Sequence, residues 1–335
     1  MKSLENLNRL KMDLAAHGKS DWRKSVWQMI NSIVPFIALW YLAYHSLTIS
    51  VWLTLALAIP AAGFLIRIFI IFHDCCHLSY FSSKKVNAII GTITGILTFF
   101  PYEQWKNEHA IHHATSGNLS RRGTGDIWTL TTDEYAALSR WGRLGYRLYR
   151  NPLVMFGLGP IYIFLVAYRM NRKNAKRKER FNTYLTNVAI VLLMAVLCLT
   201  LGWKEVLLVY GPILYLSGMA GIWLFYVQHQ FEDTYFEWAQ EWEYVKAAVE
   251  GSSYYKLPRI LQWMTGNIGF HHIHHLVPQA TNYSLQKLHE SNELLKAVPA
   301  IGIRLSLKSL QYRLWDDKAK RFVGYRYLKN KKATA

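Results

Sequence analysis

The chain has 335 residues, and its 39 Lys and Arg residues against 21 Asp and Glu residues give a formal net charge of +18. Hydrophobic residues make up 52% and charged residues 18% of the sequence. This composition excludes an intrinsically disordered chain, which would have few apolar residues and many charges. Three cysteines in a chain of this length also exclude a scaffold built on disulfides.

Aromatic residues are abundant, with 13 Trp, 21 Tyr and 15 Phe beside long apolar runs. This combination is typical of an integral membrane protein. A basic surplus can also indicate nucleic-acid binding, but here the basic residues flank apolar runs, which favours contact with an anionic cytoplasmic leaflet. The first 24 residues are polar and basic, so we expect no cleavable signal sequence.

Four apolar runs are long enough to cross about 30 Å of hydrocarbon, which takes roughly 20 helical residues. They cover residues 27–46, 49–72, 182–202 and 206–227. Two shorter runs cover residues 86–100 and 152–168. Their length is ambiguous between a short span and an interfacial or re-entrant segment.

Charge decides the topology. Residues 169–180 carry seven basic side chains and one acidic side chain, and residues 140–150 carry four arginines. The positive-inside rule places both segments in the cytoplasm, so the run between them cannot cross the membrane. We therefore predict one domain over residues 1–335, an all-α integral protein of the cell (plasma) membrane. It would have four transmembrane helices in two hairpins, two interfacial or re-entrant segments and a cytoplasmic helical cap.

Histidines form three tight clusters. Residues 73–77 read H-D-C-C-H, residues 109–113 read H-A-I-H-H, and residues 271–275 read H-H-I-H-H, while His229 follows the last apolar run. Residues at spacings of three and four share one face of a helix. The clusters and the ninth position therefore predict these metal ligands: His73, His77, His109, His112, His113, His229, His271, His274 and His275.

Neutral imidazole binds iron, copper, zinc and nickel. Because one ion takes four to six ligands, nine ligands imply two metal ions where the cytoplasmic helix ends converge. Structural zinc would use cysteines prominently. Cys75 and Cys76 lie inside the first cluster, but only Cys76 could share the face of His73, and packing is the preferred interpretation of both. His272 is rotated by about 100° from His271 and points off the ligand face.

The three clusters resemble the histidine boxes of the membrane fatty-acid desaturases. The closest resemblance is to bacterial acyl-lipid desaturases of the Bacillus delta-5 type, and it extends through R-L-Y-R-N-P at 147–152 and V-E-G-S-S-Y-Y-K-L-P at 249–258. Members of the family tend to carry a proline before the Asn-Tyr pair that follows the third box. This chain has Ala280, Thr281, Asn282 and Tyr283 there, so a local turn differs.

The resemblance implies a non-haem di-iron centre with the nine histidines as ligands. It also implies that dioxygen and two electrons remove two hydrogens from a methylene pair, leaving a cis double bond at delta-5 of a phospholipid acyl chain. The chemistry agrees, because a methylene C–H bond is neither acidic nor electrophilic and needs a cofactor-borne oxidant. The chain has no flavin, haem or iron–sulfur motif, so reduced ferredoxin or flavodoxin is the expected donor at the basic face.

Ligand histidines usually donate their second ring N–H to a carboxylate or a carbonyl oxygen. The candidate partners are Asp74, Glu108, Asp126, Glu232 and Asp233. Asn267, four residues before His271, is a candidate to hold an iron-bound water.

An apolar slot should hold the acyl chain. Its candidate wall residues, with an interfacial aromatic belt as the alternative, are Trp105, Trp128, Trp223 and Trp263. Arg121 and Arg122 are candidates to contact a lipid phosphate or an acidic electron carrier.

Two alternatives remain open at this point. Hydroxylases and carotenoid ketolases have similar boxes and use the same oxidant, so spacing does not separate them from desaturases. A metal transporter would place its ligands near the bilayer midplane on broken helices. Each histidine cluster of this chain instead lies beyond the end of a predicted span, which disfavours transport.

Overall fold

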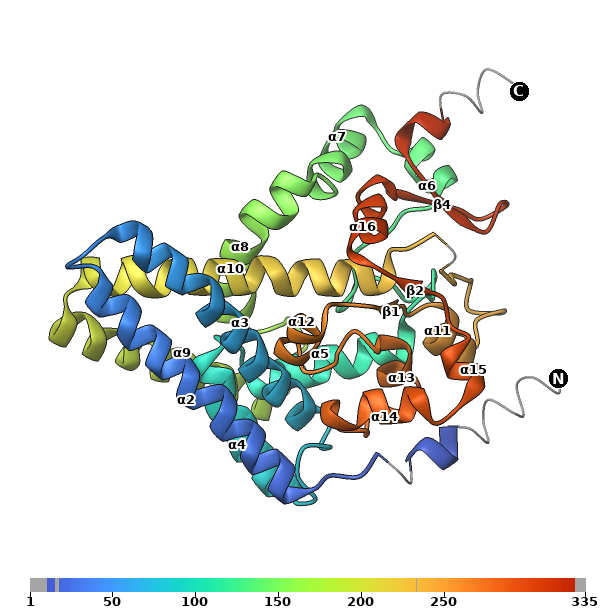
Figure 1. Cartoon of the computed structure of the whole chain (residues 1–335). Helices are drawn as coiled ribbons and strands as arrows, with labels where there is room; N and C mark the ends of the chain where they lie inside the picture. The colour runs from blue at the N-terminus through green and yellow to red at the C-terminus, as the bar shows by residue number, and fades with distance from the viewer. Residues whose placement is uncertain (1–10, 16–17, 233, 329–335) are drawn as a thin grey trace.

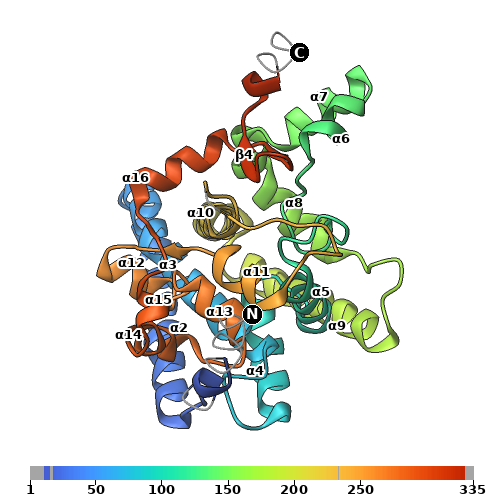
Figure 2. The same ribbon diagram turned by 90° about the vertical axis from the view of Figure 1, so that its right-hand side faces the viewer.

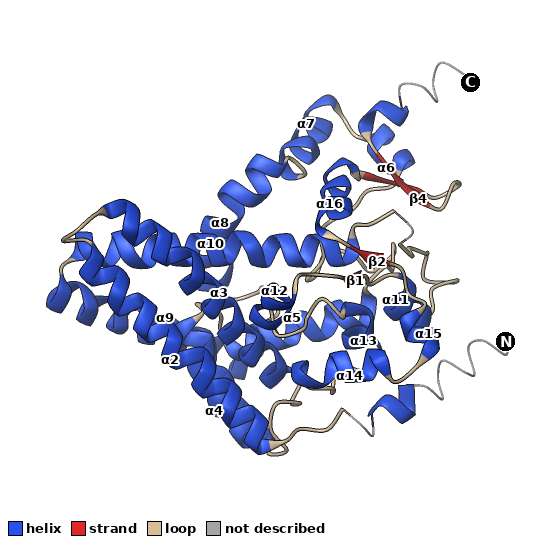
Figure 3. Ribbon diagram, viewed as in Figure 1, coloured by secondary structure: helices blue, strands red, loops and turns tan. Residues whose placement is uncertain are grey.

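Helices dominate the computed structural model, which describes residues 11–15, 18–232 and 234–328 (Figures 1 and 3). Four helices are long and apolar enough to span a membrane: α2 (Trp22–Ser46), α3 (Val51–Cys76), α9 (Arg177–Leu201) and α10 (Trp203–His229). They confirm the four predicted spans. At 1.5 Å per residue each is about 38–40 Å long, which exceeds the roughly 30 Å hydrocarbon core. Each helix is therefore longer than the hydrocarbon core that it has to cross.

The long helices form two hairpins. Residues 47–50 join α2 to α3, and Gly202, with a positive φ of 94°, joins α9 to α10. Ala43 of α2 and Ala61 of α3 are fully buried in one apolar cluster, because small side chains allow close approach of membrane helices. Both hairpin turns lie at the same end of the bundle, on the left of Figure 1, and the shorter elements gather at the other end.

The two shorter apolar runs do not form straight spans. Residues 98–101 separate helix α4 (Lys84–Leu97) from helix α5 (Tyr102–Thr115). Helix α7 (Arg140–Tyr149) is bent by 58° from the segment Leu153–Arg169, which comprises the π-helix η1 (Leu153–Leu158), α8 (Gly159–Leu165) and the 3-10 helix η2 (Ala167–Arg169). The guanidinium of Arg169 anchors the end of this segment by donating to the Phe99 carbonyl at 2.5 Å. Neither run is one of the four candidate spans, and the bent pair fits either a broken span or a re-entrant segment.

Short elements make the cap, and Figure 2 looks onto it with α10 seen end-on. The helices are α6 (Thr132–Ala137), α11 (Tyr244–Glu250), α12 (Arg259–Met264), α13 (His271–Leu276), η3 (Asn282–Ser284), α14 (Leu285–Glu290), α15 (Glu293–Lys296), α16 (Ile303–Ser306) and η4 (Leu307–Gln311). Strand β1 (Tyr254–Tyr255) pairs in parallel with β2 (Ala300–Ile301), and β3 (Leu314–Asp316) pairs antiparallel with β4 (Arg321–Val323). These strands have two or three residues each, so the all-α class holds.

Candidate metal centre

The nine predicted histidines lie together where the long helices meet the cap. Eight of them form two groups, and within each group one ring nitrogen per histidine lies within 4.8 Å of the others. The first histidine group contains His73, His77, His109 and His274. The second histidine group contains His112, His229, His271 and His275.

His113 lies between the two groups. Its Nε2 is 3.1 Å from Nε2 of His109, and its ring stacks on His275 with a centroid separation of 4.1 Å. Helices α5 and α13 thus supply ligand candidates to both groups. The sequence predicted that the histidines at 109–113 share one helix face. They are divided instead, because His109 belongs to the first histidine group and His112 belongs to the second histidine group.

The ring nitrogens converge at spacings that suit a metal ion. Nε2 of His109 is 3.0 Å from Nε2 of His73, and Nε2 of His271 is 3.0 Å from Nε2 of His229. Two nitrogens bound at a right angle, each about 2.1 Å from a metal, would lie about 3.0 Å apart, against about 3.4 Å for a tetrahedral angle. These two spacings therefore allow both nitrogens of each pair to bind the same metal ion.

The outer nitrogens of several rings are held by acceptors. Nδ1 of His73 is 3.1 Å from the Asp74 carboxylate, Nδ1 of His112 is 2.6 Å from the Asp126 carboxylate, and Nδ1 of His229 is 3.1 Å from the Gly251 carbonyl oxygen. A proton on each Nδ1 leaves the Nε2 lone pair directed into the group.

Several inner nitrogens have no hydrogen-bond partner. Nε2 of His77, His112 and His274 is buried without one among the described residues. A buried polar atom without a partner costs free energy, and a bound cation would remove that cost. The donor set therefore fits a pair of metal ions.

Burial also keeps these rings neutral. Desolvation, followed by the neighbouring histidines, holds the pKa of His109, His113 and His274 well below the usual histidine value. Charged imidazoles would repel one another and the metal, whereas neutral imidazole is the form that coordinates it.

Asp74 is fixed by a residue that sequence reasoning missed. Its Oδ2 accepts hydrogen bonds from the backbone N–H of Asn282 at 2.7 Å and from the Asn282 side-chain amide at 2.8 Å. The Asn282 oxygen accepts in turn from Nε2 of Gln28 on α2 at 2.9 Å. This buried series of hydrogen bonds connects the first histidine group to α2, the first membrane-spanning helix. In the sequence, only the missing family proline before Asn282 marked this segment as unusual. That difference did not indicate that Asn282 contacts Asp74.

The other residues that the sequence predicted to accept hydrogen bonds from ligand histidines differ in their contacts. Asp126 contacts a histidine, whereas Glu108 accepts hydrogen bonds from the Tyr168 hydroxyl at 3.0 Å and the Gln104 amide at 3.3 Å. Glu232 is exposed, and Asp233 lies outside the described residues. The Asn267 amide donates to the Asn282 carbonyl oxygen at 3.3 Å, so its role with an iron-bound water stays a prediction.

His272 and the two neighbouring cysteines lie outside both histidine groups. His272 is fully buried and packs beside His289, with ring centroids 5.4 Å apart. Cys75 and Cys76 are buried in an apolar cluster that also contains Tyr102. These positions agree with the off-face interpretation of His272 and the packing interpretation of both cysteines.

A cavity of about 760 Å³ adjoins the histidines and continues between α3, α5, α8 and α10. His73, His109 and His271 line one part of it, and Leu65, Phe164 and Ser217 line another. Its volume lies in the range of small-molecule sites. Among the predicted tryptophan wall residues only Trp105 lines this cavity; the aromatic wall residues missed from sequence are Phe69, Phe100, Tyr149, Tyr162, Phe164, Tyr168 and Phe225.

The remaining predicted wall residues have other contacts. Trp223 donates from Nε1 to the Tyr255 hydroxyl at 3.3 Å, and Trp263 lies against the guanidinium of Arg67 at 3.8 Å. Trp128 is 43% exposed. Their positions in the sequence did not indicate which side of each element faces the cavity.

A fatty acid desaturase family profile matches residues 49–304, which contain all nine histidines. The chain is 59% identical over 322 residues to the Bacillus subtilis (strain 168) protein named fatty acid desaturase, a match covering 96% of this chain and 92% of that protein. The chain belongs to the fatty acid desaturase family. The resemblance drawn from its histidine boxes is therefore confirmed.

Plant members of the family are more distant. An Arabidopsis thaliana chloroplastic omega-6 fatty acid desaturase is 26% identical over 277 residues, covering 78% of this chain and 58% of the plant protein. An Arabidopsis thaliana protein named sn-2 acyl-lipid omega-3 desaturase (ferredoxin) is 25% identical over 308 residues, covering 86% of this chain and 65% of its own length. Membership in this family supports fatty-acid desaturation as the activity of this chain.

Proposed function

We propose that this desaturase introduces a cis double bond into the acyl chains of membrane phospholipids, using two non-haem iron ions, dioxygen and an external electron donor. The observation that carries the proposal is the continuity of one cavity from His73, His109 and His271 to an apolar region between the long helices. A methylene pair of a lipid tail could lie against the metal centre there while the rest of the tail stays away from water.

The nine histidines would hold the iron ions, with the first and second histidine groups each around one ion and His113 beside the first. When bound, the iron pair supplies, with dioxygen and two electrons, the oxidising power that an unactivated C–H bond requires. The chain's own residues orient the substrate and exclude water. Trp105 stacks on His109 with centroids 4.2 Å apart, and Phe225 lies 5.0 Å from the His112 ring.

The distribution of polar wall residues supports a direction for the acyl chain. Among the residues that line the cavity, Glu108 precedes His109 and Asp126 contacts His112, whereas Leu65 and Phe164 belong to the apolar cluster between the long helices. We infer that the ester end lies near the histidines and the methyl end lies in the deep apolar part. This direction supports a double bond near the carboxyl end, and delta-5 is our proposed position.

The proposed location is the cell membrane, with the metal centre on the cytoplasmic side. The basic run at 169–180 favours that side, and the histidines lie at the opposite end of the bundle from both hairpin turns. Ferredoxin or flavodoxin is the proposed donor. Arg121 is exposed in the loop that leads to Asp126, whereas Arg122 is engaged by Glu134 and by the Thr129 carbonyl oxygen at 2.8 Å. Arg121 is therefore the better candidate contact for an acidic donor.

Expression in a bacterial host with saturated membrane lipids tests the proposal. Gas chromatography and mass spectrometry of dimethyl disulfide adducts should reveal monounsaturated chains with the double bond at delta-5, and their formation should require dioxygen. An inactive His112→Ala variant is the matched control. An unchanged fatty-acid profile with iron-loaded protein would contradict the proposal, and a product that gains oxygen would instead identify a hydroxylase.

A further inference from the structure

The wall that α10 contributes to the cavity has a gap in its side chains. Ser217, Gly221, Phe225 and Gln228 line the cavity at spacings of three and four, so they share one helix face. Gly221 lies in the middle of that face. It precedes His229 by eight residues, which places it about 12 Å from the metal centre along the helix axis.

Two glycines on this wall have different surroundings. A Cβ atom built at Gly218 would lie 2.6 Å from the Phe164 ring and 2.9 Å from Cβ of Pro160, whereas a Cβ atom at Gly221 would meet no atom within 4 Å. Glycine at 218 therefore permits the close packing of α8 on α10. At 221 a side chain would occupy the cavity itself.

We propose that Gly221 sets the length of acyl chain that can lie beyond the metal centre, and thereby selects the chain length and the position of the double bond. The inference rests on the proposed desaturation of acyl chains. Phe225 lies one turn nearer the metal and contacts the His112 ring, so a tail that passes it next meets the open surface at Gly221. A branched side chain there would fill the space that the methyl end needs.

The test compares wild type with Gly221→Leu and Gly221→Ala in cells whose phospholipids carry saturated chains of graded length. Gly221→Leu should raise the ratio of short-chain to long-chain product by roughly tenfold or more, because hydrophobic pockets discriminate by about that factor per methylene. In long chains that still react, the double bond should move toward the methyl end. Gly221→Ala should shift both readouts in the same direction by less.

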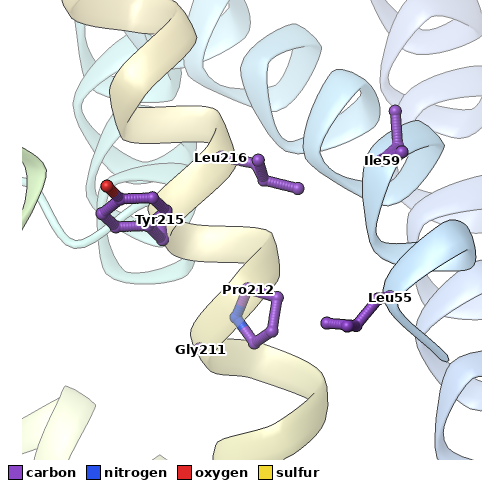
Figure 4. A pocket seen from close by; sticks show the side chains of 6 residues that line it. All are labelled: Leu55, Ile59, Gly211, Pro212, Tyr215 and Leu216. Atoms are coloured by element: carbon purple, nitrogen blue, oxygen red, sulfur yellow. The ribbon is translucent and has the colours of Figure 1, made fainter. Parts of the chain in front are cut away.

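A matched control lies on the same helix outside the cavity. Gly211 borders a shallow apolar groove with Leu55, Ile59 and Pro212 between α3 and α10 (Figure 4). A Cβ atom at Gly211 would have only an ordinary contact with Leu207, at 3.6 Å. Gly211→Leu should therefore leave chain length and double-bond position as in wild type.

Further measurements distinguish a folding defect, a failure of the proposed function and a failure of the proposed role of Gly221. The iron content and melting temperature of Gly221→Leu should match those of wild type, and if that variant does not fold, Gly221→Ala supplies the test. A wild-type enzyme that makes no double bond would overturn the proposed function. An active wild type with Gly221 variants that keep its product pattern, or that slow equally on every chain length, would overturn the role of Gly221.

Discussion

The two histidine groups share helices α5 and α13 but are supported differently. Behind the first group, the Asp74 side chain is 2% exposed and is held by Asn282, which reaches Gln28 on the first span. Behind the second group, the Asp126 side chain is 15% exposed and lies in the loop between α5 and α6, where it also lines the cavity. The carboxylate behind the first group is thus tied to a membrane helix, whereas the carboxylate behind the second lies in a loop beside the substrate path.

Removal of a ligand candidate should have the largest effect. His112→Ala should lower activity by about 100-fold or more, because residues behind a metal ligand already account for 10–100-fold. The protein should still insert in the membrane but should lose iron from the second histidine group first. Metal analysis of the purified variant checks this, and a variant with full iron content would show that His112 is not a ligand.

Removal of the Asp74 or the Asp126 carboxylate should show how the support of the two histidine groups differs. Asp74→Ala and Asp126→Ala should each lower metal affinity by about 10–100-fold. Asp74→Ala should also lower the free energy of unfolding, because it leaves two N–H donors of Asn282 unpaired at a cost of about 1–3 kcal/mol each. Metal titration and thermal unfolding of both variants would separate the two effects, and equal melting temperatures would contradict the difference in support.

Asn282→Ala should give an intermediate result. Asp74 would keep its contact with His73 but lose the amide donor at 2.8 Å, so metal affinity should fall by less than in Asp74→Ala. Gln28→Ala removes a hydrogen bond one step further from Asp74, so it should lower metal affinity by less than Asn282→Ala does. If Gln28→Ala weakened metal binding more than Asn282→Ala, the order of contacts from α2 to His73 would be wrong.

Changes outside the two groups should have the smallest effect on metal. His272→Ala should keep the iron content of wild type, although it removes a buried ring beside His289 and should lower stability. Glu232→Ala, at an exposed position, should change neither quantity. Equal metal loss in His272→Ala and His112→Ala would show that the third cluster has been assigned to the wrong face.

The sequence predicted the four spans and the nine histidines because hydrophobic length and helical spacing are local properties. It did not predict how α5 and α13 divide their histidines between two groups, since that depends on how separate helices approach one another. Asn282 and Phe225 were missed for the same reason, because their contacts with Asp74 and His112 join distant segments. Trp105 was identified as a wall residue, but the walls supplied by α8 and α10 required the tertiary structure.

We infer that the two histidine groups hold a pair of iron ions. Metal analysis of the purified, active wild-type protein tests it most directly. We expect about two iron ions per chain, because nine imidazole ligands exceed the coordination capacity of one ion. Active protein without iron, or protein that binds a single ion with both groups intact, would contradict it.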